Sequence, residues 1–256
     1  MGGHGDTEYH VPVDRKIQQQ EQSKRMNFRK LSILLAGLLI SSQSMAAFTL
    51  NGTRFIYGSG SKNISFEVTN HSPDTWGGQV WIDNESMPSD SVSLIPAPTF
   101  FRVDGNQKQV IRILDVNDAL LPKDRESLFR LNVQEIPPAP KSEGNVLALA
   151  MNTRVKLIYR PEALSAGRQD AEKQLRIEQR GSTSVLVNPT PYYFAVVALH
   201  HGATDKGAVI SVPKSSPQPD TLAPHAEVPL GKVVSLPVTV QAIDDYGATR
   251  SYTLGQ

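Results

Sequence analysis

The sequence predicts an all-β protein made of two immunoglobulin-like β-sandwich domains. Short segments of alternating apolar and polar residues recur along the chain with turn residues between them, a pattern typical of antiparallel sandwiches. The 256 residues include 18 prolines and 18 glycines but few long helical patterns, which favours the same fold class. A chain of this length accommodates two domains of about 100 residues each, with additional segments.

The N-terminal segment reads as a targeting signal rather than as part of a domain. A short basic region at 27–30 precedes an apolar run at 31–40, and Ser44-Met45-Ala46 has the small residues of a cleavage site. This order is typical of a secretory signal peptide, and the apolar run is too short to span a bilayer. We therefore predict a cleaved signal peptide at 26–46, with an uncleaved anchor as the alternative. Residues 1–25 are then a mis-assigned upstream start or an extension lost with the signal.

The composition of the remaining chain excludes several classes of function. Without residues 1–46 the chain carries 20 basic and 21 acidic residues and no basic block, so nucleic-acid or membrane-surface binding has no support. It contains no cysteine, which excludes disulfides, thiol catalysis and structural zinc on thiolates. Each domain must therefore be held together by its hydrophobic core.

Strands can be assigned in both domains from alternation and turn residues. In a first domain at 47–163 they are expected at 48–50, 53–57, 64–69, 78–83, 100–103, 109–114 and 128–136. Trp81 is placed in the core, Asn51-Gly52 is expected to form a turn or bulge, and Pro96-Ala97-Pro98 is expected to break the chain. In a second, smaller domain at 164–256, strands are expected at 175–178, 184–187, 192–199, 233–240 and 251–254.

The segment 144–161 holds the most informative pattern. Between Val146 and Tyr159 there is no proline or glycine, so a strand of about 14 residues can form, whereas ordinary strands have about 5–6. Most residues of one parity, including Leu147, Leu149 and Met151, are large and apolar. Two interpretations stay open at this point. The apolar row belongs to the domain's own core, or its first half completes the core of another protein.

Several motifs in chain order resemble the periplasmic pilus-assembly chaperones of the PapD-like family. They are LPKDRESLFRLNVQEIPP at 121–138, NVLALAMNTRVKLIYRP at 145–161, NPTPYY at 188–193, Thr53-Arg54 and Asp245-Tyr246-Gly247. The resemblance implies two immunoglobulin-like domains in an L or boomerang arrangement with a cleft between them. It implies a periplasmic protein that completes pilus subunits with its own strand and delivers them to an outer-membrane usher, without a cofactor, metal or ATP. This mode of binding is β-augmentation.

The resemblance also assigns roles to individual residues. Arg54 and Lys156 match the pair of cations that anchors the subunit's C-terminal carboxylate. Leu147, Leu149 and Met151 match the apolar residues that face the subunit, and their burial would contribute about 5–8 kcal/mol before opposing terms. Glu126, Arg160 and Asp245 match a structural ionic triad between the domains. Strict alternation puts Lys156 and Leu147 on opposite faces of the strand, so a bulge or bend is expected to bring both to one partner.

Two other functions compete with that of a chaperone. Catalysis finds little support, because no serine has nucleophile-elbow spacing and His200, His201 and His225 are interpreted as surface-loop residues. A secreted structural or adhesive protein, such as a pilus subunit, is the second alternative. Pilus subunits resemble one incomplete sandwich with a disulfide, whereas this chain has two domains and no cysteine.

The short 137–144 loop favours the subfamily that serves rod-shaped pili. Self-association through the Leu147–Met151 strand is a further hypothesis.

Overall fold

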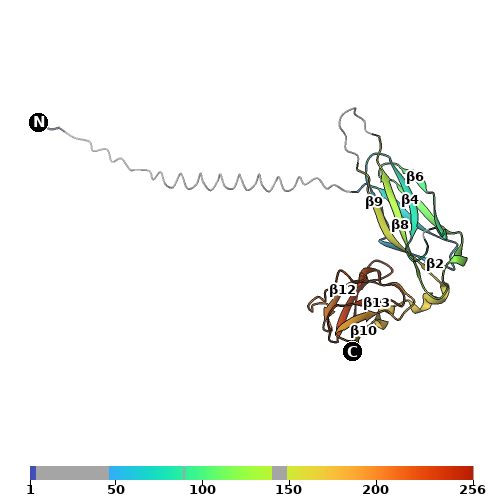
Figure 1. The fold of residues 1–256 in the computed structure, drawn as a ribbon. Coiled ribbons are helices and arrows are strands. Elements are labelled where there is room, and N and C mark those ends of the chain that lie inside the picture. The colour runs from blue at the N-terminus through green and yellow to red at the C-terminus, as the bar shows by residue number, and fades with distance from the viewer. Residues whose placement is uncertain (4–45, 89, 140–148, 256) are drawn as a thin grey trace. The chain divides into compact units, whose positions relative to one another are not determined.

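The computed structural model describes residues 1–3, 46–88, 90–139 and 149–255. Most of the predicted extension at 1–25 and nearly all of the predicted signal peptide at 26–46 lie outside these residues, and so does Leu147. The described strands form two groups, with β4, β6, β8 and β9 in one body and β10, β12 and β13 in the other (Figure 1). Within the described part of the chain, no helix is long and apolar enough to cross a membrane.

The first domain is a sandwich of two sheets. One has the order β1-β3-β7-β5 and contains β1 (Phe48–Leu50), β3 (Asn63–Asn70), β7 (Lys108–Asp115) and β5 (Leu94–Ala97). The other has the order β2-β9-β8-β4-β6 and contains β2 (Arg54–Gly58), β9 (Asn152–Arg160), β8 (Ser127–Ile136), β4 (Trp76–Asn84) and β6 (Phe100–Val103). Neighbouring strands run antiparallel except β2 and β9, which run parallel. A 3-10 helix, η1 (Asp118–Leu120), precedes β8.

The second domain also has two sheets. Their orders are β10-β11-β13 and β12-β14-β15. The strands are β10 (Arg176–Arg180), β11 (Thr183–Val187), β12 (Ala195–His201), β13 (Glu227–Pro229), β14 (Val238–Ile243) and β15 (Thr249–Leu254). Short 3-10 helices lie at η2 (Glu162–Gly167), η3 (Ala171–Gln174) and η4 (Pro219–Thr221). The protein is therefore all-β with two sandwich domains, as the alternation predicted.

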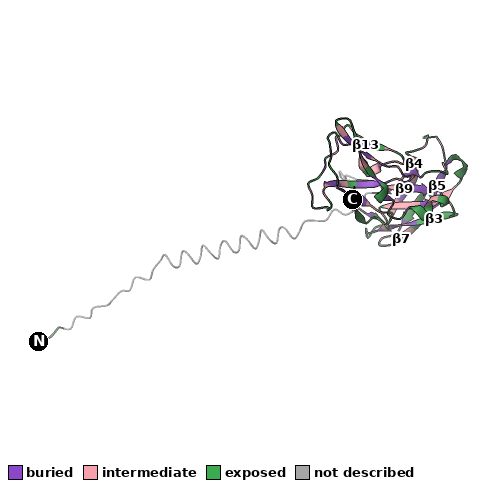
Figure 2. Cartoon of the chain, turned by 90° about the horizontal axis from the view of Figure 1, so that it is seen from below, coloured by how far each residue is buried: buried purple, intermediate pink, exposed green. Residues whose placement is uncertain are grey.

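Each domain has its own hydrophobic core. In the first, Phe66, Ile111, Phe129, Leu131 and Leu157 are each no more than 1% exposed and belong to one cluster. A separate cluster fills the second domain and includes Leu186, Phe194, Leu199, Val238 and Val240. Buried residues recur along the strands of both domains, as Figure 2 shows in purple. Two separate cores explain how a chain without disulfides holds two domains.

The structure corrects several details of the strand prediction. β5 was missed because Pro96-Ala97-Pro98 was taken as a chain break, β13 was not assigned, and β14 begins at Val238 rather than at residue 233. Both missed strands contain a proline and lie at the edge of their sheets, where the missing N–H of a proline is tolerated. Trp81 is only partly buried, because Val80 occupies the core-facing position of β4 (1% exposed). Asn51-Gly52 lies where the chain passes from one sheet, through β1, to the other, through β2.

The long strand is shorter than predicted in its described part. β9 covers Asn152–Arg160, and residues 149–151 are not strand, although the carbonyl of Met151 accepts a hydrogen bond from the Glu135 amide at 2.8 Å. The strand ends at Arg160, as expected, because Pro161 has no N–H to continue the ladder. No register shift interrupts the pairing of β9 with β8 or with β2, so the expected bulge is absent from the described strand.

Two leucines of the same segment test where the core of the first domain ends. Leu157 is fully buried and Leu149 is 69% exposed. We expect Leu157→Ala to lower the free energy of unfolding by about 2–5 kcal/mol through the cavity it leaves. Leu149→Ala should change it by less than about 0.5 kcal/mol. Urea unfolding followed by tryptophan fluorescence measures both values. Similar losses in the two variants would contradict this boundary of the core.

Candidate functional site

The first half of β9 lies at an open edge of its sheet. β2 pairs with β9 only from Lys156 to Arg160, so β8 is the only described strand beside the residues before Lys156. The hydrogen bond from the Glu135 amide to Met151 fixes which residues pair directly with β8. Because hydrogen-bonded and non-bonded pairs alternate in an antiparallel ladder, Asn152 and Arg154 direct their backbone N–H and C=O groups away from β8. The open edge can therefore accept another strand.

The apolar row continues beyond the core of the first domain. Val155, Leu157 and Tyr159 belong to the core face of β9, and the last two are fully buried. Leu149 and Met151 share this parity, yet they are 69% and 52% exposed. Met151 still pairs with β8 through its carbonyl, so it extends this face past the point where the domain covers it, and Leu149 continues the same parity outside the strand. Leu147, the third residue of the predicted row, lies outside the described residues.

The two predicted anchor cations come together although they are far apart in the sequence. Arg54 is the first residue of β2, and its register partner in the parallel ladder is Lys156 of β9. Register partners in neighbouring strands project to the same face of a sheet. The cations therefore lie side by side at the point where β2 begins and the open edge of β9 ends.

Both cations are partly desolvated by contacts with the second domain. The guanidinium Nη1 of Arg54 donates to the carbonyl of Ile243 at 3.1 Å, and Nζ of Lys156 donates to the carbonyl of Asp220. A small pocket at this point is lined by the two cations together with Leu128, Ile158, Tyr193, Phe194, Ala195 and Thr221. A carboxylate placed here would meet two positive charges in a site with limited access to water.

The environment of the cations shifts their proton affinities. Burial lowers the pKa of Arg54 below its ordinary value, although the carboxylates of Asp245 and Asp244 oppose the shift. Burial, followed by repulsion from Arg130 and Arg54, lowers the pKa of Lys156, while Asp220 acts to raise it. Such shifts are typical of charged groups whose compensating partner is incomplete.

The three residues of the predicted ionic triad lie in one connected network that joins the two domains. Arg160, at the end of β9, donates from Nε to Glu126 at 2.6 Å and from Nη1 to Asp245 at 2.7 Å. The second carboxylate oxygen of Glu126 accepts from the backbone amide of Tyr193 at 2.7 Å. Burial raises the pKa of Glu126, although Arg160 and the Tyr193 amide both act to lower it. The side chains of Arg160 and Glu126 are 9% and 0% exposed.

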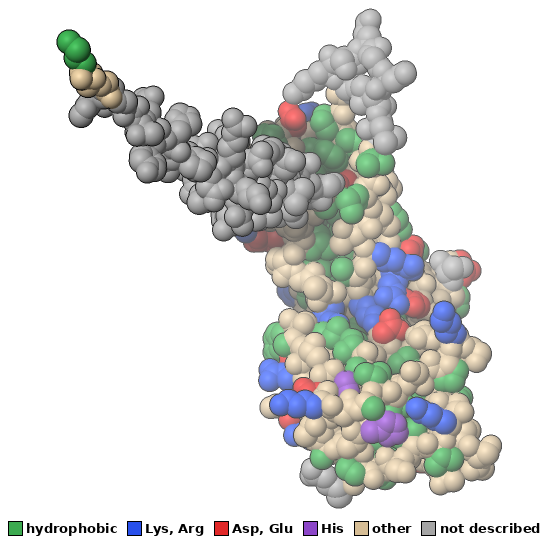
Figure 3. All heavy atoms as spheres, turned by 90° about the vertical axis from the view of Figure 1, so that its left-hand side faces the viewer, with side chains coloured by type: hydrophobic (Ala, Val, Ile, Leu, Met, Phe, Trp, Pro, Cys, Tyr) green, Lys and Arg blue, Asp and Glu red, His purple; other side chains and the backbone are tan. Residues whose placement is uncertain are grey.

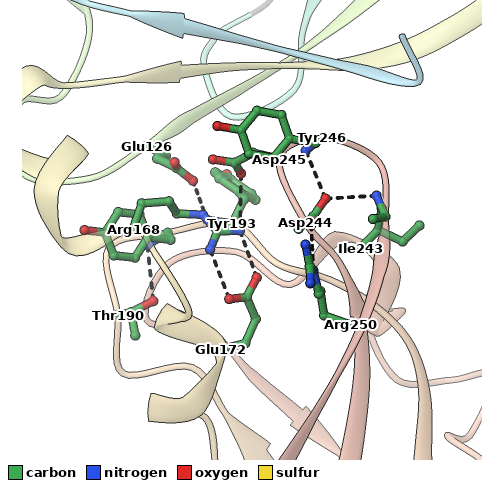
Figure 4. Close-up of polar contacts among 12 residues, drawn as sticks. Glu126, Arg168, Glu172, Thr190, Tyr193, Ile243, Asp244, Asp245, Tyr246 and Arg250 are labelled. Carbon is green, nitrogen blue, oxygen red and sulfur yellow. Dashed lines mark hydrogen bonds and ion pairs between the residues drawn. The ribbon is translucent and has the colours of Figure 1, made fainter.

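The network extends further than the sequence indicated. Arg168 lies 3.3 Å from Asp245 and makes a two-pronged contact with Glu172, at 3.0 and 2.8 Å (Figure 4). Its guanidinium also lies over the rings of Tyr192 and Phe194. The spacing of four residues between Arg168 and Glu172 was the available signal, but it has meaning only on a helical turn, and none was expected there. The hydrogen bond from the Tyr193 backbone amide to Glu126 could not be predicted from the sequence, because a backbone amide is present at almost every residue.

Two of the three candidate histidines, His200 and His201, lie on a strand rather than on a surface loop. His200 was expected on a surface loop, but it lies on β12, is 8% exposed, and its ring nitrogens contact the carbonyl of Gly207 and the side chain of Gln241. A buried strand position explains why this prediction was wrong. No cluster of three or more His, Cys, Asp or Glu side chains suited to a metal ion occurs among the described residues.

Removing the shared cation of the network should destabilise the protein strongly. Arg160→Met removes the cation shared by Glu126 and Asp245 and leaves the buried Glu126 carboxylate without its ion pair, so we expect the free energy of unfolding to fall by about 3–5 kcal/mol. Lys108→Met, which breaks the exposed pair with Glu67 at 2.8 Å, is the control and should cost no more than about 1 kcal/mol. Urea unfolding measures both. A loss for Arg160→Met no larger than that of the control would contradict a stabilising role.

Comparisons with known proteins bear on this geometry. Residues 47–165 match the family model described as pili and flagellar-assembly chaperone, PapD N-terminal domain. Residues 170–254 match the model described as pili assembly chaperone PapD, C-terminal domain. The chain is 45% identical over 235 residues to the chaperone protein FanE of Escherichia coli, an alignment that covers 88% of this chain and 97% of FanE.

Solved structures show the same fold. The periplasmic chaperone SfaE is 28% identical with a TM-score of 0.62, and the alignment covers 81% of this chain and 98% of that chain. A chain in the complex of the Salmonella enterica SafA pilin with the SafB chaperone has a TM-score of 0.67. That chain is 24% identical to this one, and the alignment covers 83% of this chain and 97% of that chain. At this identity the comparison supports a shared fold. With both family models matched in order and FanE aligned over almost its full length, the chain belongs to the PapD family of pili assembly chaperones.

Proposed function

We propose that this chaperone binds a pilus subunit by adding the subunit's C-terminal strand to the open edge of β9. The observation that carries the proposal is the junction of β2 and β9. There the edge of β9 stops being open at Lys156, where Arg54 begins the neighbouring strand. A strand that fills this edge must end at the two cations, and a chain terminus brings a carboxylate to them. Backbone hydrogen bonds along the edge do not depend on the side chains of the subunit strand, so they can form with subunits of different sequence.

The position of the cations determines the direction of the added strand. They lie on the C-terminal side of Leu149 and Met151 along β9. A subunit strand whose C-terminus is held at Lys156 and whose body covers the apolar row must therefore run parallel to β9. β2 already pairs with β9 in the parallel sense, so the subunit strand continues the direction of β2 along the same edge. The beginning of β2 acts as the stop that sets the register.

Addition at an edge also accounts for contacts on both faces of β9. Met151 and Lys156 lie on opposite faces, and the described strand has no bulge between them. A strand that pairs along the edge lies in the plane of the sheet, so its alternate side chains reach both faces. The apolar side chains of the subunit would pack beside Leu149 and Met151, while its terminal carboxylate meets the cations. No bend in β9 is required.

The cellular context follows from the family and from the sequence. We propose that the predicted signal peptide at 26–46 directs the chain to the periplasm, the compartment named for SfaE. There the chaperone would cap subunits and deliver them to an outer-membrane usher. The proposed binding mode uses backbone pairing, apolar burial and one ion-paired terminus, and it needs no bound nucleotide, metal or cofactor. We assign the network of Glu126, Arg160 and Asp245 the structural role of holding the two domains around the anchor.

Removal of either cation should release the subunit without unfolding the chaperone. Lys156→Ala and Arg54→Ala each remove one partner of the terminal carboxylate, so we expect affinity to fall by about 30-fold or more, equivalent to at least about 2 kcal/mol. The exposed Lys214→Ala and Arg176→Ala serve as matched controls. Co-expression with a panel of pilus subunits in the Escherichia coli periplasm, followed by purification of complexes, measures the effect. Equal recovery with folded anchor variants and with controls would refute the anchor.

The lowered pKa of Lys156 predicts how binding depends on pH. Because burial and the neighbouring arginines lower this pKa, the amine begins to lose its proton below the ordinary lysine value of 10.5. The carboxylate of the subunit favours the charged amine, so affinity is greatest below the pKa of free Lys156 and falls as the pH rises through it. Titration of wild type and Lys156→Arg between neutral and alkaline pH tests this. The arginine variant should bind with little pH dependence, and an identical profile in both proteins would contradict the assignment.

A further inference from the structure

We infer that Arg154 selects subunits that carry an acidic side chain on the outer face of their C-terminal strand, close to the terminal carboxylate. The inference rests on the proposed function and concerns the chemistry of the partner. By outer face we mean the face of the β9-β8-β4 sheet that carries Arg154, Asn132 and Asp83. This face is opposite the one that carries the apolar row.

The outer face beside the open edge is charged rather than apolar. Strand register places Asn152, Arg154 and Lys156 of β9 beside Gln134, Asn132 and Arg130 of β8 in three adjacent pairs. Arg130 in turn pairs with Asp83 of β4. Figure 3 shows basic side chains gathered with acidic ones on one face of the described part of the chain. A strand added to β9 would therefore lay its outward side chains next to polar and cationic groups.

The other polar side chains of this face already have close partners. Arg130 binds Glu85 through two nitrogens, with a 2.9 Å contact between Nη2 and Oε1. The amide of Asn132 donates to Asp83 at 2.9 Å, and the amide of Asn152 donates to Asn132 at 3.2 Å. These contacts form a hydrogen-bonded ladder across β4, β8 and β9. They leave little capacity on these side chains for binding a partner.

Arg154 is the loosely held member of the ladder. Its Nη2 is 3.8 Å from the Asp83 carboxylate, beyond hydrogen-bond range, and the two side chains are 54% and 46% exposed. Asp83 already accepts the closer hydrogen bond from Asn132. The guanidinium of Arg154 therefore keeps donors available for a carboxylate that approaches from the open edge.

The position of Arg154 relative to the anchor defines which subunit residue it meets. It precedes Lys156 by two residues on the same face of β9, a separation of about 6.6–6.8 Å along the strand. A parallel subunit strand that ends at Lys156 presents one outward side chain to Arg154 within its last four residues. An acidic residue there gains a charge-assisted contact. A basic residue meets repulsion from Arg154, with Lys156 and Arg130 close by.

Peptides of defined charge test this inference directly. The probes are dye-labelled peptides with a free C-terminal carboxylate and alternating apolar and polar residues, made in both alternation phases. One polar residue among the last four is Glu, Gln or Lys. Fluorescence anisotropy with the wild-type chain should rank affinity as Glu above Gln above Lys, by roughly fivefold a step. Arg154→Glu should reverse the ranking, and Arg154→Gln should flatten it. The exposed Arg176→Glu is the matched control and should keep the wild-type ranking.

The outcomes separate this inference from the function on which it rests. Lys156→Ala should weaken all peptides alike and keep their ranking. If both Arg154 variants keep the wild-type ranking while Lys156→Ala weakens every peptide, the inference is wrong and the anchor stands. If Lys156→Ala binds as tightly as wild type while Arg154→Glu reverses the ranking, the anchor is wrong and charge selection stands. Absence of binding by every peptide would overturn both. Circular dichroism melting of each variant establishes that it is folded.

Discussion

The parallel pairing of β2 with β9 is the constraint on which the rest of the site depends. The chain leaves one sheet after β1 and joins the other at Arg54, so β2 covers only the second half of β9. Gly52 occupies this crossing, where a Cβ would lie 3.1 Å from the ring of Phe55 and 3.3 Å from a backbone oxygen. If β2 began several residues earlier on the same sheet, it would cover the edge that we propose for the subunit. The crossing thus opens the edge and supplies one of the cations at its end.

The outer face of β9 is exposed in the first half of the strand and contacts the second domain in the second half. Asn152 and Arg154 are exposed, whereas Lys156, Ile158 and Arg160, on the same face, are wholly or partly buried. Lys156 contacts the Asp220 carbonyl and Arg160 binds Asp245, both in the second domain. The second half of the strand therefore holds the second domain, and its first half is the part that we propose for the partner. This arrangement explains why the anchor and the ionic network lie four residues apart on β9, and why the second domain contributes to the environment of the anchor.

Much of this could be predicted from the sequence, and the failures have physical causes. Alternation gave the fold class and most strands, because period-2 patterns report burial directly. The pairing of Arg54 with Lys156 was expected from the resemblance alone, since parallel contacts between distant strands leave no local signal. β5 was missed because Pro96-Ala97-Pro98 was taken as a chain break, since the sequence does not show that this segment is an edge strand, where proline is tolerated. Backbone contacts, such as those of Ile243, Asp220 and Tyr193 with the site, do not depend on side-chain identity and are invisible in a sequence.

The two faces of the open edge make different contributions to recognition. In the proposed mode of binding, burial of Leu149 and Met151 and backbone pairing would favour any extended apolar strand, so they would give affinity with little discrimination. Specificity is a difference between affinities, and it requires an element that penalises the wrong partner. On the core face the described row of β9 carries no charge, and the buried carboxylate of Glu135 beside it is held by the Phe48 amide at 2.8 Å. The outer face has such an element in Arg154. The neighbouring polar side chains are already hydrogen-bonded to one another, so the guanidinium of Arg154 is the charge most available beside the open edge. A chaperone built in this way can accept several subunits that share an apolar strand and still reject strands of the wrong charge.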